Sequence, residues 1–248
     1  MSAVEKVVVF GATSAMAQQA VRLLAREGAE LVLVGRDPEK LAAVSADAVL
    51  RGARSAARIP ADLDDCSRFD ELAGDVFGRL GRVDLVLLAQ GLLGDTPACE
   101  RDPALAARVL HTNLVAPALL LERVAARMAG QGSGTIVGIS SVAGDRGRQS
   151  NYVYGAAKGG LSLYLSGLRN RLARSGVHVV TVKPGLVDTP MTAAMPRSRL
   201  FSHPSTVAVA ILRAVRHRSD EVYVPGYWRA VMWIVRHVPE RMFKRMRL

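Results

Sequence analysis

Short apolar segments alternate with amphipathic segments along almost the whole chain, and this alternation is the feature that most restricts its fold. The apolar segments cover residues 6–10, 30–35, 56–60, 83–89, 134–140, 177–183 and 221–224. The amphipathic segments cover residues 15–27, 38–51, 65–79, 102–128, 152–173 and 204–217. Continuously apolar strands that alternate with helices are typical of a parallel sheet with helices on both faces. The sequence therefore predicts an α/β protein with a doubly wound parallel sheet of about seven strands.

No linker or internal repeat divides the 248 residues, so we expect one domain over residues 1–225 and a C-terminal tail over residues 226–248. The two cysteines, Cys66 and Cys99, lack metal-ligand spacing, and the first residues are not those of a signal peptide. We therefore expect no metal site, reduced thiols and a cytoplasmic location. No apolar run approaches the ~18 residues of a membrane span, so no transmembrane helix is expected.

The segment GATSAMA at residues 11–17 lies between the first strand and the first helix, where a doubly wound sheet binds the pyrophosphate of a dinucleotide. The positions expected at the phosphates are Gly11, Thr13, Ser14, Ala15 and Met16. Gly11 allows a sharp turn, and the hydroxyls of Thr13 and Ser14 either bind phosphate or cap the helix. Because alanine replaces two of the three usual glycines, a strand–helix turn that binds no ligand remains an alternative for this segment alone.

Four polar residues further along the chain favour an enzyme. Tyr154 and Lys158 are four residues apart in YVYGAAK and share one helical face. Ser141 ends the strand segment GTIVGISS, and Asn113 lies in HTNLVAP on the preceding long helix. In this order and spacing they resemble the active-site residues of the short-chain dehydrogenase/reductase superfamily, and the resemblance covers nearly the whole chain. It implies a Rossmann fold and an NAD(P)-dependent oxidoreductase that reduces a ketone to a secondary alcohol.

The resemblance also implies a role for each residue. Tyr154 transfers a proton, and the ammonium of Lys158 is expected to lower the pKa of that phenol and to hold the nicotinamide ribose. Ser141 is expected to hold the substrate carbonyl against Tyr154, and Asn113 to fix a water that links Lys158 to solvent. The structural alternatives are a strand-end cap for Ser141 and a polar helix residue for Asn113. Tyr152 is not assigned to catalysis, because Lys158 is six residues away on another face.

The end of the second strand predicts which cofactor is used. An acidic residue there usually accepts the ribose hydroxyls of NAD(H), but this chain has Gly35 followed by Arg36. The guanidinium favours NADP(H), with NAD(H) as the alternative. We expect Asp37 to cap the next helix rather than bind ribose. The other expected cofactor contacts are Asp62, Leu63, Ala89, Gly91, Tyr154, Lys158, Pro184, Gly185, Val187 and Thr189.

Positive charge is concentrated near the C-terminus. The net charge is +11, and the residues from Arg197 onward include eleven Lys and Arg against three Asp and Glu. Trp228, Val231, Met232 and Val235 fall on one helical face among these basic residues, a pattern typical of a helix at a membrane interface. A subunit-docking helix and a solubilising tail are the alternatives, and nucleic acid is not expected because no reading motif accompanies the charge.

The substrate loop at residues 191–204 combines apolar side chains with Arg197 and Arg199. This composition suits an apolar substrate that carries an anionic group, and a mobile loop with solvated arginines is the alternative.

Three segments are most similar to the decaprenylphosphoryl-2-keto-ribose reductase group: residues 90–95, 140–155 and 231–245. The similarity implies a keto-sugar on a polyprenyl phosphate, a partner oxidase and peripheral contact of the tail with the inner face of the membrane. Arg146 and Arg148 then either meet the phosphate or are solvated. The family resemblance also implies a homodimer or homotetramer. Two other interpretations stay open: a ketoreductase for a soluble or acyl substrate (fatty acyl, steroid or polyketide), and a non-catalytic dinucleotide-binding scaffold.

Overall fold

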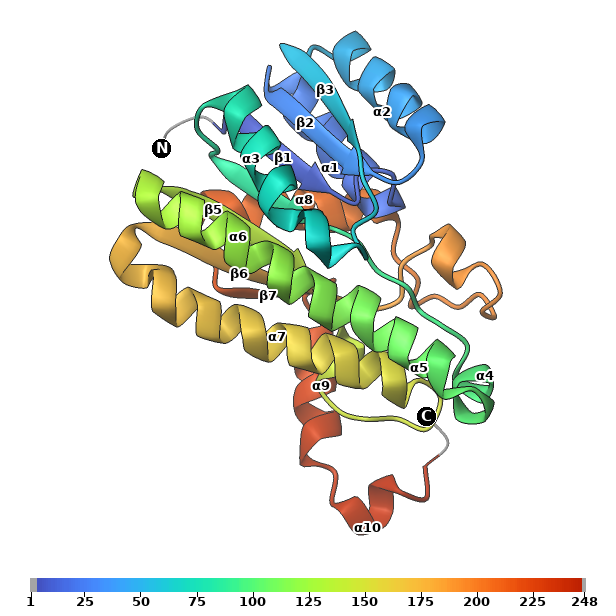
Figure 1. The fold of residues 1–248 in the computed structure, drawn as a ribbon. Coiled ribbons are helices and arrows are strands. Elements are labelled where there is room, and N and C mark those ends of the chain that lie inside the picture. Colours follow the sequence, from blue (N-terminus) through green and yellow to red (C-terminus); the bar gives the residue numbers. More distant parts are fainter. Residues whose placement is uncertain (1–3, 247–248) are drawn as a thin grey trace.

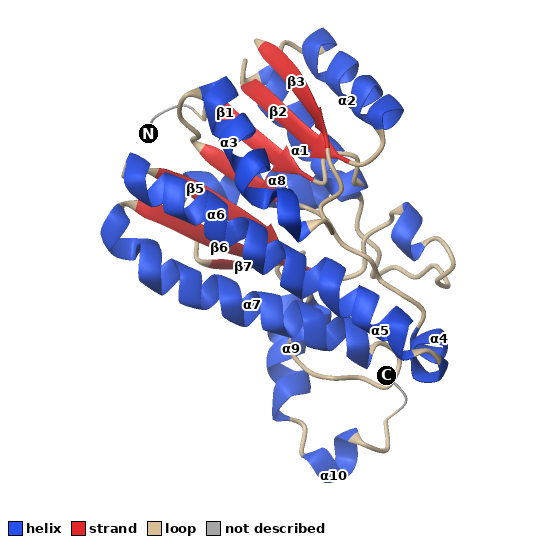
Figure 2. Cartoon of the chain, viewed as in Figure 1, coloured by secondary structure: helices blue, strands red, loops and turns tan. Residues whose placement is uncertain are grey.

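In the computed structural model, which describes residues 4–246, the strands form one parallel sheet in the order β3-β2-β1-β4-β5-β6-β7 (Figures 1 and 2). The strands are β1 (Lys6–Phe10), β2 (Glu30–Gly35), β3 (Ser55–Pro60), β4 (Leu85–Leu88), β5 (Gly134–Ile139), β6 (Val177–Pro184) and β7 (Glu221–Val224). The predicted doubly wound sheet is confirmed. Its direction of winding reverses between β1 and β4, and in such sheets a ligand binds at the carboxyl ends of the strands on either side of that point.

Helices cover both faces of the sheet. One face carries α1 (Ala15–Arg26), α2 (Pro38–Leu50) and α8 (Pro204–Arg216), and the other carries α3 (Phe69–Leu80), α6 (Ala116–Gln131) and α7 (Tyr152–Leu172). Within β1, Val7 and Val9 pack on the first face, and Val8 and Phe10 pack on the second. Both faces of the central strands are therefore buried, which is why β1 and β4 are almost continuously apolar rather than alternating with polar residues.

The segment expected as one helix over 102–128 is divided. Asp102 caps α5 (Pro103–Leu110), and a π-helical turn, His111–Val115, joins α5 to α6. Just before this segment, Asp95 caps a separate short helix, α4 (Thr96–Arg101). Contrary to our expectation, the continuous stretch Pro103–Gln131 is long and apolar enough to cross a membrane by length and composition alone. In the structure the inner side of α6 packs on the sheet, as expected for a core helix.

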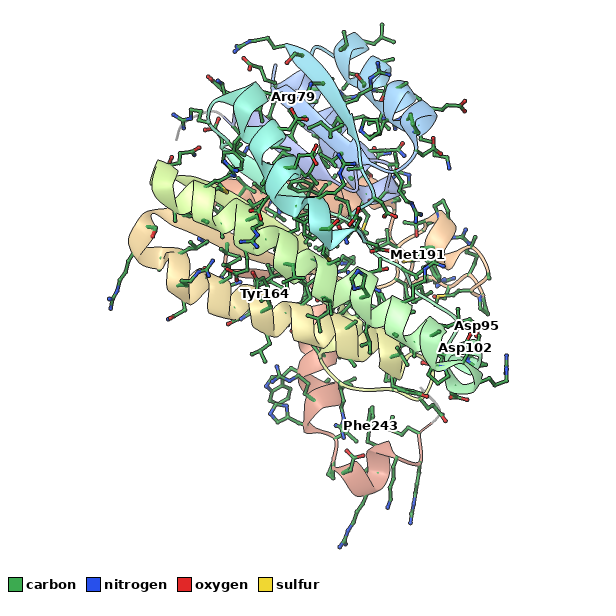
Figure 3. The ribbon with its side chains drawn as sticks, viewed as in Figure 1. Arg79, Asp95, Asp102, Tyr164, Met191 and Phe243 are labelled. Atoms are coloured by element: carbon green, nitrogen blue, oxygen red, sulfur yellow. The ribbon has the colours of Figure 1, made fainter. Side chains whose placement is uncertain are left out.

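Helices α6 and α7 lie side by side across one face of the sheet (Figure 1). The hydroxyl of Tyr164 on α7 shares its hydrogen between the Ala118 carbonyl (3.0 Å) and Glu122 Oε1 (2.7 Å) on α6, which ties the two helices together (Figure 3).

The C-terminal segment leaves the sheet after β7. It contains α9 (Trp228–His237) and α10 (Glu240–Phe243), and Figure 1 shows both extending beyond the body of the molecule. Helix α9 ends before Pro239, as the sequence predicts, because proline has no amide hydrogen with which to continue the helix.

Candidate active site

The first strand–helix turn has the geometry of a phosphate-binding loop. Gly11 has a φ of +77°, and a side chain on it would come within 2.7 Å of the Gln90 backbone nitrogen, so glycine is required there. Ser14 caps α1 and accepts a hydrogen bond from the Ala17 amide (3.2 Å). Because the N-terminus of α1 follows directly, this loop presents the positive end of a helix dipole to the cleft beside it.

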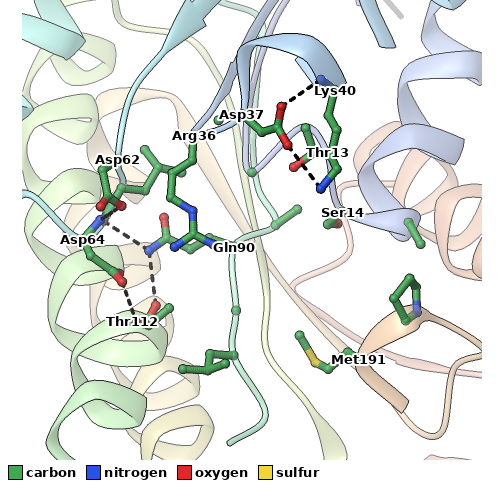
Figure 4. Close-up of a pocket in the computed structure, with 18 of the residues that line it drawn as sticks. Thr13, Ser14, Arg36, Asp37, Lys40, Asp62, Asp64, Gln90, Thr112 and Met191 are labelled. Carbon is green, nitrogen blue, oxygen red and sulfur yellow. Dashed lines mark hydrogen bonds and ion pairs between the residues drawn. The ribbon is translucent and has the colours of Figure 1, made fainter. Parts of the chain in front are cut away.

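A cleft of about 550 Å³ lies at the carboxyl ends of β1, β2 and β4, a size within the range of small-molecule sites (Figure 4). The structure brings most of the expected cofactor residues together in its lining: Gly11, Thr13, Ser14, Ala15, Met16, Arg36, Asp62, Leu63, Ala89, Gly91 and Thr189. Contact of these residues with a cofactor stays a prediction, since they are placed here only by the geometry of the protein chain.

Five expected cofactor residues are not among those that line this cleft: Tyr154, Lys158, Pro184, Gly185 and Val187. Pro184 ends β6, and Val187 is buried in the core. A side chain at Gly185 would overlap the indole of Trp228, so its open side accommodates a residue from the tail, and its contact with a cofactor stays a prediction.

Met191 of the expected substrate loop lines the cleft, and the cleft also contains residues that sequence reasoning missed: Asp64, Gln90, Leu92, Arg108, Thr112 and Pro190. Thr112 donates to Asp64 Oδ2 (2.8 Å), and the Gln90 amide donates to the Thr112 carbonyl (3.2 Å), as drawn in Figure 4. Asp64 and Gln90 directly follow expected residues at strand ends, which is a usable sequence signal. Arg108 and Thr112 reach the cleft from the α5–α6 segment and have no such local signal.

The negative charge of the carboxylate that follows β2, that of Asp37, is compensated by neighbouring groups. Asp37 caps α2, accepting hydrogen bonds from the Glu39 and Lys40 amides (3.1 and 3.0 Å), and its Oδ2 lies 3.1 Å from Lys40 Nζ. The hydrogen bonds from Lys40 and its charge lower the pKa of Asp37. The expected capping role is confirmed. Arg36 is exposed at the cleft and makes no ion pair with a carboxylate of residues 4–246, so positive charge dominates this corner.

The loop after β5 lies against α7 because glycines allow a very close approach. A side chain on Gly144 would come within 2.5 Å of the Gly159 nitrogen, and one on Gly155 within 2.8 Å of the Ala143 carbonyl oxygen. This contact sets Ser141, which is at the start of the loop, beside Tyr154 on α7. Ser141 also accepts a hydrogen bond from the Ala143 amide (3.1 Å), so its structural role as a cap is real as well.

Lys158 is buried, with 3% of its surface exposed. Its Nζ donates to the Ile139 carbonyl at 3.0 Å and lies 5.9 Å from the centre of the Tyr154 ring. Burial lowers the pKa of Lys158 to about 8. Burial raises the pKa of Tyr154 to about 12, with the Ser141 hydroxyl acting in the opposite direction. The expectation that Lys158 lowers the pKa of this phenol is therefore not met by the chain's own groups, because loss of solvent dominates.

Asn113 lies in the π-helical turn, and its side chain is fully buried. Its Nδ2 donates to the carbonyls of Leu92 and Val109 (2.7 and 2.8 Å), and its Oδ1 accepts from the Leu92 amide (3.1 Å). Asn113 therefore pins the strand-end loop that carries Gly91. A side chain on Gly91 would reach within 3.1 Å of Asn113 Oδ1 and 3.5 Å of Lys158 Nζ, so this glycine keeps the space between them open.

Tyr152 projects from the start of α7 with 43% of its surface exposed, whereas Tyr154 is half-buried and Lys158 is buried. Its exclusion from the site agrees with this placement.

On the substrate loop, Arg197 already has a partner. Its Nη1 lies 2.5 Å from Asp188 Oδ1, and its guanidinium stacks at 5.3 Å from the centre of the Phe201 ring. Because both partners are more than half exposed, this ion pair is weak, and the expected role of Arg197 in holding an anionic group of the substrate stays a prediction.

The tail does not present the face that the sequence suggested. Trp228 and Met232 are buried against the body, with 8% and 2% of their surfaces exposed. Val231 of the predicted face is exposed, and the other exposed apolar residues of the tail lie outside that face: Tyr227, Trp233, Ile234, Met242 and Met246. Arg146 is neither solvated nor directed at a ligand, because it hydrogen-bonds to α9. The amphipathic pattern was correct, but the predicted side for membrane contact was wrong.

No group of His, Cys, Asp and Glu residues that is suited to bind a metal occurs within the part of the chain that the structure describes. Both cysteines are free thiols.

The comparisons with known proteins agree with this geometry. Residues 5–199 match the family model of the short chain dehydrogenases. An uncharacterized oxidoreductase of Mycobacterium tuberculosis is 36% identical over 240 residues, covering 97% of this chain and 96% of the relative. The ketoacyl reductase HetN of a Nostoc species is 31% identical over 223 residues, covering 88% and 77%. The crystal structure of an actinorhodin polyketide ketoreductase with NADPH has a TM-score of 0.81 at 25% identity and covers 90% of this chain and 96% of its own.

The chain belongs to the short-chain dehydrogenase family, and it is an NAD(P)-dependent oxidoreductase. The NADPH in the actinorhodin enzyme agrees with the preference for NADP(H) that Arg36 predicts.

Proposed function

We propose that this protein reduces a ketone to a secondary alcohol and that Tyr154 supplies the proton to the carbonyl oxygen. The main support for this proposal is that Ser141, Tyr154 and Lys158 come together at the carboxyl edge of the sheet, beside a cleft lined by a phosphate-binding loop. The reduced nicotinamide, when bound, supplies the hydride. The chain's own groups hold the substrate and move the proton.

The chain's own groups suit the direction of reduction. A pKa of about 12 keeps the proton on Tyr154 at neutral pH, so the proton is present for transfer, but it also makes the phenol a weak acid. Ser141, next to the phenol, is available to hold the carbonyl oxygen. Lys158, with a pKa of about 8, is mostly protonated at pH 7, and Gly91 leaves room beside its ammonium. Asn113 holds the loop that carries Gly91 in place through its contacts with backbone groups. We propose that Asn113 also fixes the water that returns a proton through Lys158.

We propose NADP(H) as the preferred cofactor, with NAD(H) as the weaker one. Arg36 and Lys40 lie at the cleft where the ribose 2′-phosphate is expected, and the only carboxylate at this strand end among the described residues, Asp37, is held by the α2 N-terminus and Lys40. A 2′-phosphate therefore meets the guanidinium of Arg36, which has no carboxylate partner among residues 4–246.

The decisive variant is Tyr154→Phe. Turnover should be abolished, because phenylalanine has no proton to transfer, while the dissociation constant for NADPH, measured by fluorescence titration, should stay within about twofold. Tyr152→Phe is the matched control, since Tyr152 is on the same helix but exposed, and it should retain activity. Comparable turnover in Tyr154→Phe would remove this residue from the mechanism. Failure of the wild-type protein to bind NADPH would favour the non-catalytic scaffold.

For the substrate, we propose a keto-sugar on a polyprenyl phosphate, reduced at the inner face of the membrane together with a partner oxidase. The support is the resemblance of residues 90–95, 140–155 and 231–245 together with the exposed surface of the tail. Trp233, Ile234 and Met242 are 64%, 60% and 61% exposed. Exposed basic residues surround them: Arg229, Arg236, Arg241, Lys244 and Arg245. Apolar side chains ringed by cations match an anionic lipid surface.

Sedimentation with phosphatidylglycerol vesicles tests this contact. The double variant Trp233→Ser/Ile234→Ser should bind about tenfold or more weakly, because burying each side chain contributes roughly 1.5 kcal/mol or more. Leu50→Ser is the control, since Leu50 is 86% exposed at the end of α2 and should leave binding unchanged. Equal sedimentation of the double variant and the wild type would refute a membrane role for this surface.

A reductase for a soluble or acyl ketone is the second candidate. The observation that favours it is the similarity to a ketoacyl reductase and to a polyketide ketoreductase. Turnover of acyl ketones in solution, without vesicles and without loss on tail mutation, would favour this candidate over the lipid-linked sugar.

We also propose a homodimer or homotetramer that pairs through α6 and α7. Leu119 on α6 and Leu163 on α7 are 47% and 77% exposed, which is unusual for such large apolar side chains unless a partner covers them. Within each subunit, residues 1–225 would form the reductase domain and residues 226–248 the tail.

A further inference from the structure

Arg146 joins the loop that follows Ser141 to the C-terminal segment. Its Nη2 donates to Glu240 Oε2 (2.9 Å), and its guanidinium lies 3.7 Å from the centre of the ring of Phe243, the tail residue labelled in Figure 3. Its Nη1 donates to three backbone carbonyls at the end of α9: Val235 (2.6 Å), Val238 (2.6 Å) and Arg236 (3.3 Å). One side chain, only 14% exposed, therefore contacts both helices of the tail.

These carbonyls need such a partner. The last carbonyls of a helix have no amide within the helix to pair with, and they carry its partial negative charge. Pro239 offers no amide hydrogen, so the chain beyond α9 is poorly suited to satisfy them. Arg146 acts as the cap of α9 from about ninety residues earlier in the sequence, and its positive charge suits the negative end of the helix.

The residue before Arg146 is anchored in the sheet. Asp145 has a side chain only 3% exposed, and it accepts hydrogen bonds from Lys183 Nζ on β6 (2.8 Å) and from the Tyr223 hydroxyl on β7 (2.6 Å). Consecutive residues thus point in two directions: Asp145 holds the loop to the sheet, and Arg146 holds the tail to the loop. Arg146 is a rigidly mounted contact point for α9 and α10.

The start of α9 fills a position beside the active site. Trp228 packs over Gly185, which follows β6, and against Val142, the neighbour of Ser141. Its Nε1 is buried and has no hydrogen-bond acceptor among residues 4–246. Packing favours this position of the indole, but the unsatisfied donor disfavours it, because released indole would hydrogen-bond to water. Contacts elsewhere in the tail must therefore help to keep Trp228 in place.

We propose that Arg146 is a positioning residue that latches the C-terminal segment, so that α9 forms a fixed wall of the substrate site beside Ser141. The latch stands on the contacts described above. Its effect on the substrate site rests on the proposed function.

Quenching of tryptophan fluorescence by acrylamide tests the latch directly. The chain has two tryptophans, and Trp233→Phe leaves Trp228 as the sole reporter. In that background Trp228, at 8% exposure, should be poorly quenched, and Arg146→Ala should bring its quenching toward that of an indole as exposed as Trp233, at 64%. Guanidinium ion at millimolar concentration should partly restore the protection in Arg146→Ala, because it supplies the missing donors.

Two controls keep the result interpretable. Glu240→Gln removes only the ion pair with Arg146, in which the Glu240 side chain is 77% exposed. Arg229→Ala removes an exposed charge on α9 itself. In both variants the fluorescence of Trp228 should be quenched as in the parent. Arg146→Lys keeps the charge but cannot make the same set of contacts, so it should be intermediate, and it serves as the test if the alanine variant does not fold. Quenching equal to the parent in both Arg146 variants would overturn the latch.

Reduction of 2,3-butanedione with NADPH tests the consequence at the site. Arg146→Ala should lower kcat/KM for the diketone about tenfold or more, as expected when a substrate wall is displaced, while the NADPH dissociation constant stays within about twofold. Release of Trp228 without a change in kcat/KM would overturn the role of α9 as a substrate wall. Failure of Tyr154→Phe to lower turnover would instead refute the proposed function and leave the quenching result standing.

Discussion

Two buried lysines in contrasting surroundings provide the sharpest test of the electrostatics of this protein. Lys158 is 3% exposed, and the structure shows no carboxylate of residues 4–246 in an ion pair with it. Lys183 is 6% exposed, and its Nζ lies 2.8 Å from both Asp145 and Glu221. Burial acts to lower the pKa of Lys183, but these two carboxylates outweigh it and raise the pKa. Replacement by methionine, which has a similar length and no charge, should therefore have opposite effects at the two positions.

At Lys158 the magnitude follows from the pKa. A decrease from 10.5 to about 8 corresponds to a cost of about 3 kcal/mol for keeping the ammonium buried at neutral pH. Lys158→Met removes this cost and loses the hydrogen bond to the Ile139 carbonyl, which contributes roughly 1 to 2 kcal/mol. We expect the free energy of unfolding at pH 7 to rise by roughly 1 to 2 kcal/mol and Tm by roughly 2 to 8 °C. Activity should be lost in the same variant.

The pH dependence gives a second check on the same variant. Between about pH 8 and 10.5 the unfolded chain holds a proton on Lys158 that the folded protein has released, so the stability of the wild type rises with pH across this window. The advantage of Lys158→Met should therefore be greatest below pH 8 and should shrink above it. Urea denaturation at pH 7 and pH 10 measures both values.

Lys183→Met is the matched control. It leaves the carboxylate of Asp145, which is 3% exposed, without its buried cation, and we expect a loss of roughly 3 kcal/mol or more. If Lys158→Met proves less stable than the wild type at pH 7 while Lys183→Met behaves as expected, the buried ammonium is not a net cost and the reasoning from burial is wrong.

Two further predictions concern the cleft. Arg36→Leu should weaken NADPH binding about tenfold or more and leave NADH binding nearly unchanged, because only NADPH carries the 2′-phosphate; equal loss for both cofactors in a fluorescence titration would contradict this assignment. Gly91→Ala should weaken NADPH binding, since its methyl group would enter the space between Asn113 and Lys158. Gly78→Ala, on α3 with no atom near the added methyl, is the control and should bind NADPH normally; unchanged binding in Gly91→Ala would show that this space is not used.

Much of the fold could be predicted from the sequence because both faces of the sheet are covered. Continuous apolar runs such as residues 30–35 and 177–183 have few other stable solutions, and both are strands. The long helix expected over 102–128 was less accurate. Asp102 and Pro103 are a helix-start signal inside the amphipathic pattern, and the π-helical turn at Asn113 has no sequence signature strong enough to anticipate.

Within the site, the pairing of Tyr154 with Lys158 followed from their spacing and the addition of Ser141 from the family resemblance, whereas their protonation followed from neither. The pKa of Tyr154 depends on how completely the surrounding chain excludes water, and that exclusion comes from segments distant in sequence. Spacing places an ammonium near a phenol but does not reveal whether burial or attraction dominates. The packing of Trp228 over Gly185 could not be anticipated for a similar reason, because that indole comes from the tail.

The tail shows why an amphipathic pattern cannot by itself identify what its apolar side contacts. Helix α9 has apolar residues on two sides: Trp228 and Met232 face the body, and Trp233 and Ile234 face outward. A spacing of three and four residues identifies one apolar side of a helix, and in this chain it selected the inner side. Packing within the subunit does not cover the outer side, so the outer side is the one available to a partner. Because Arg146 and Trp228 hold α9 in one orientation, a lipid surface bound there would lie at a constant angle to the carboxyl edge of the sheet. A ketone anchored in that surface would then approach Ser141 and Tyr154 from a constant direction, which a freely mobile tail would not provide.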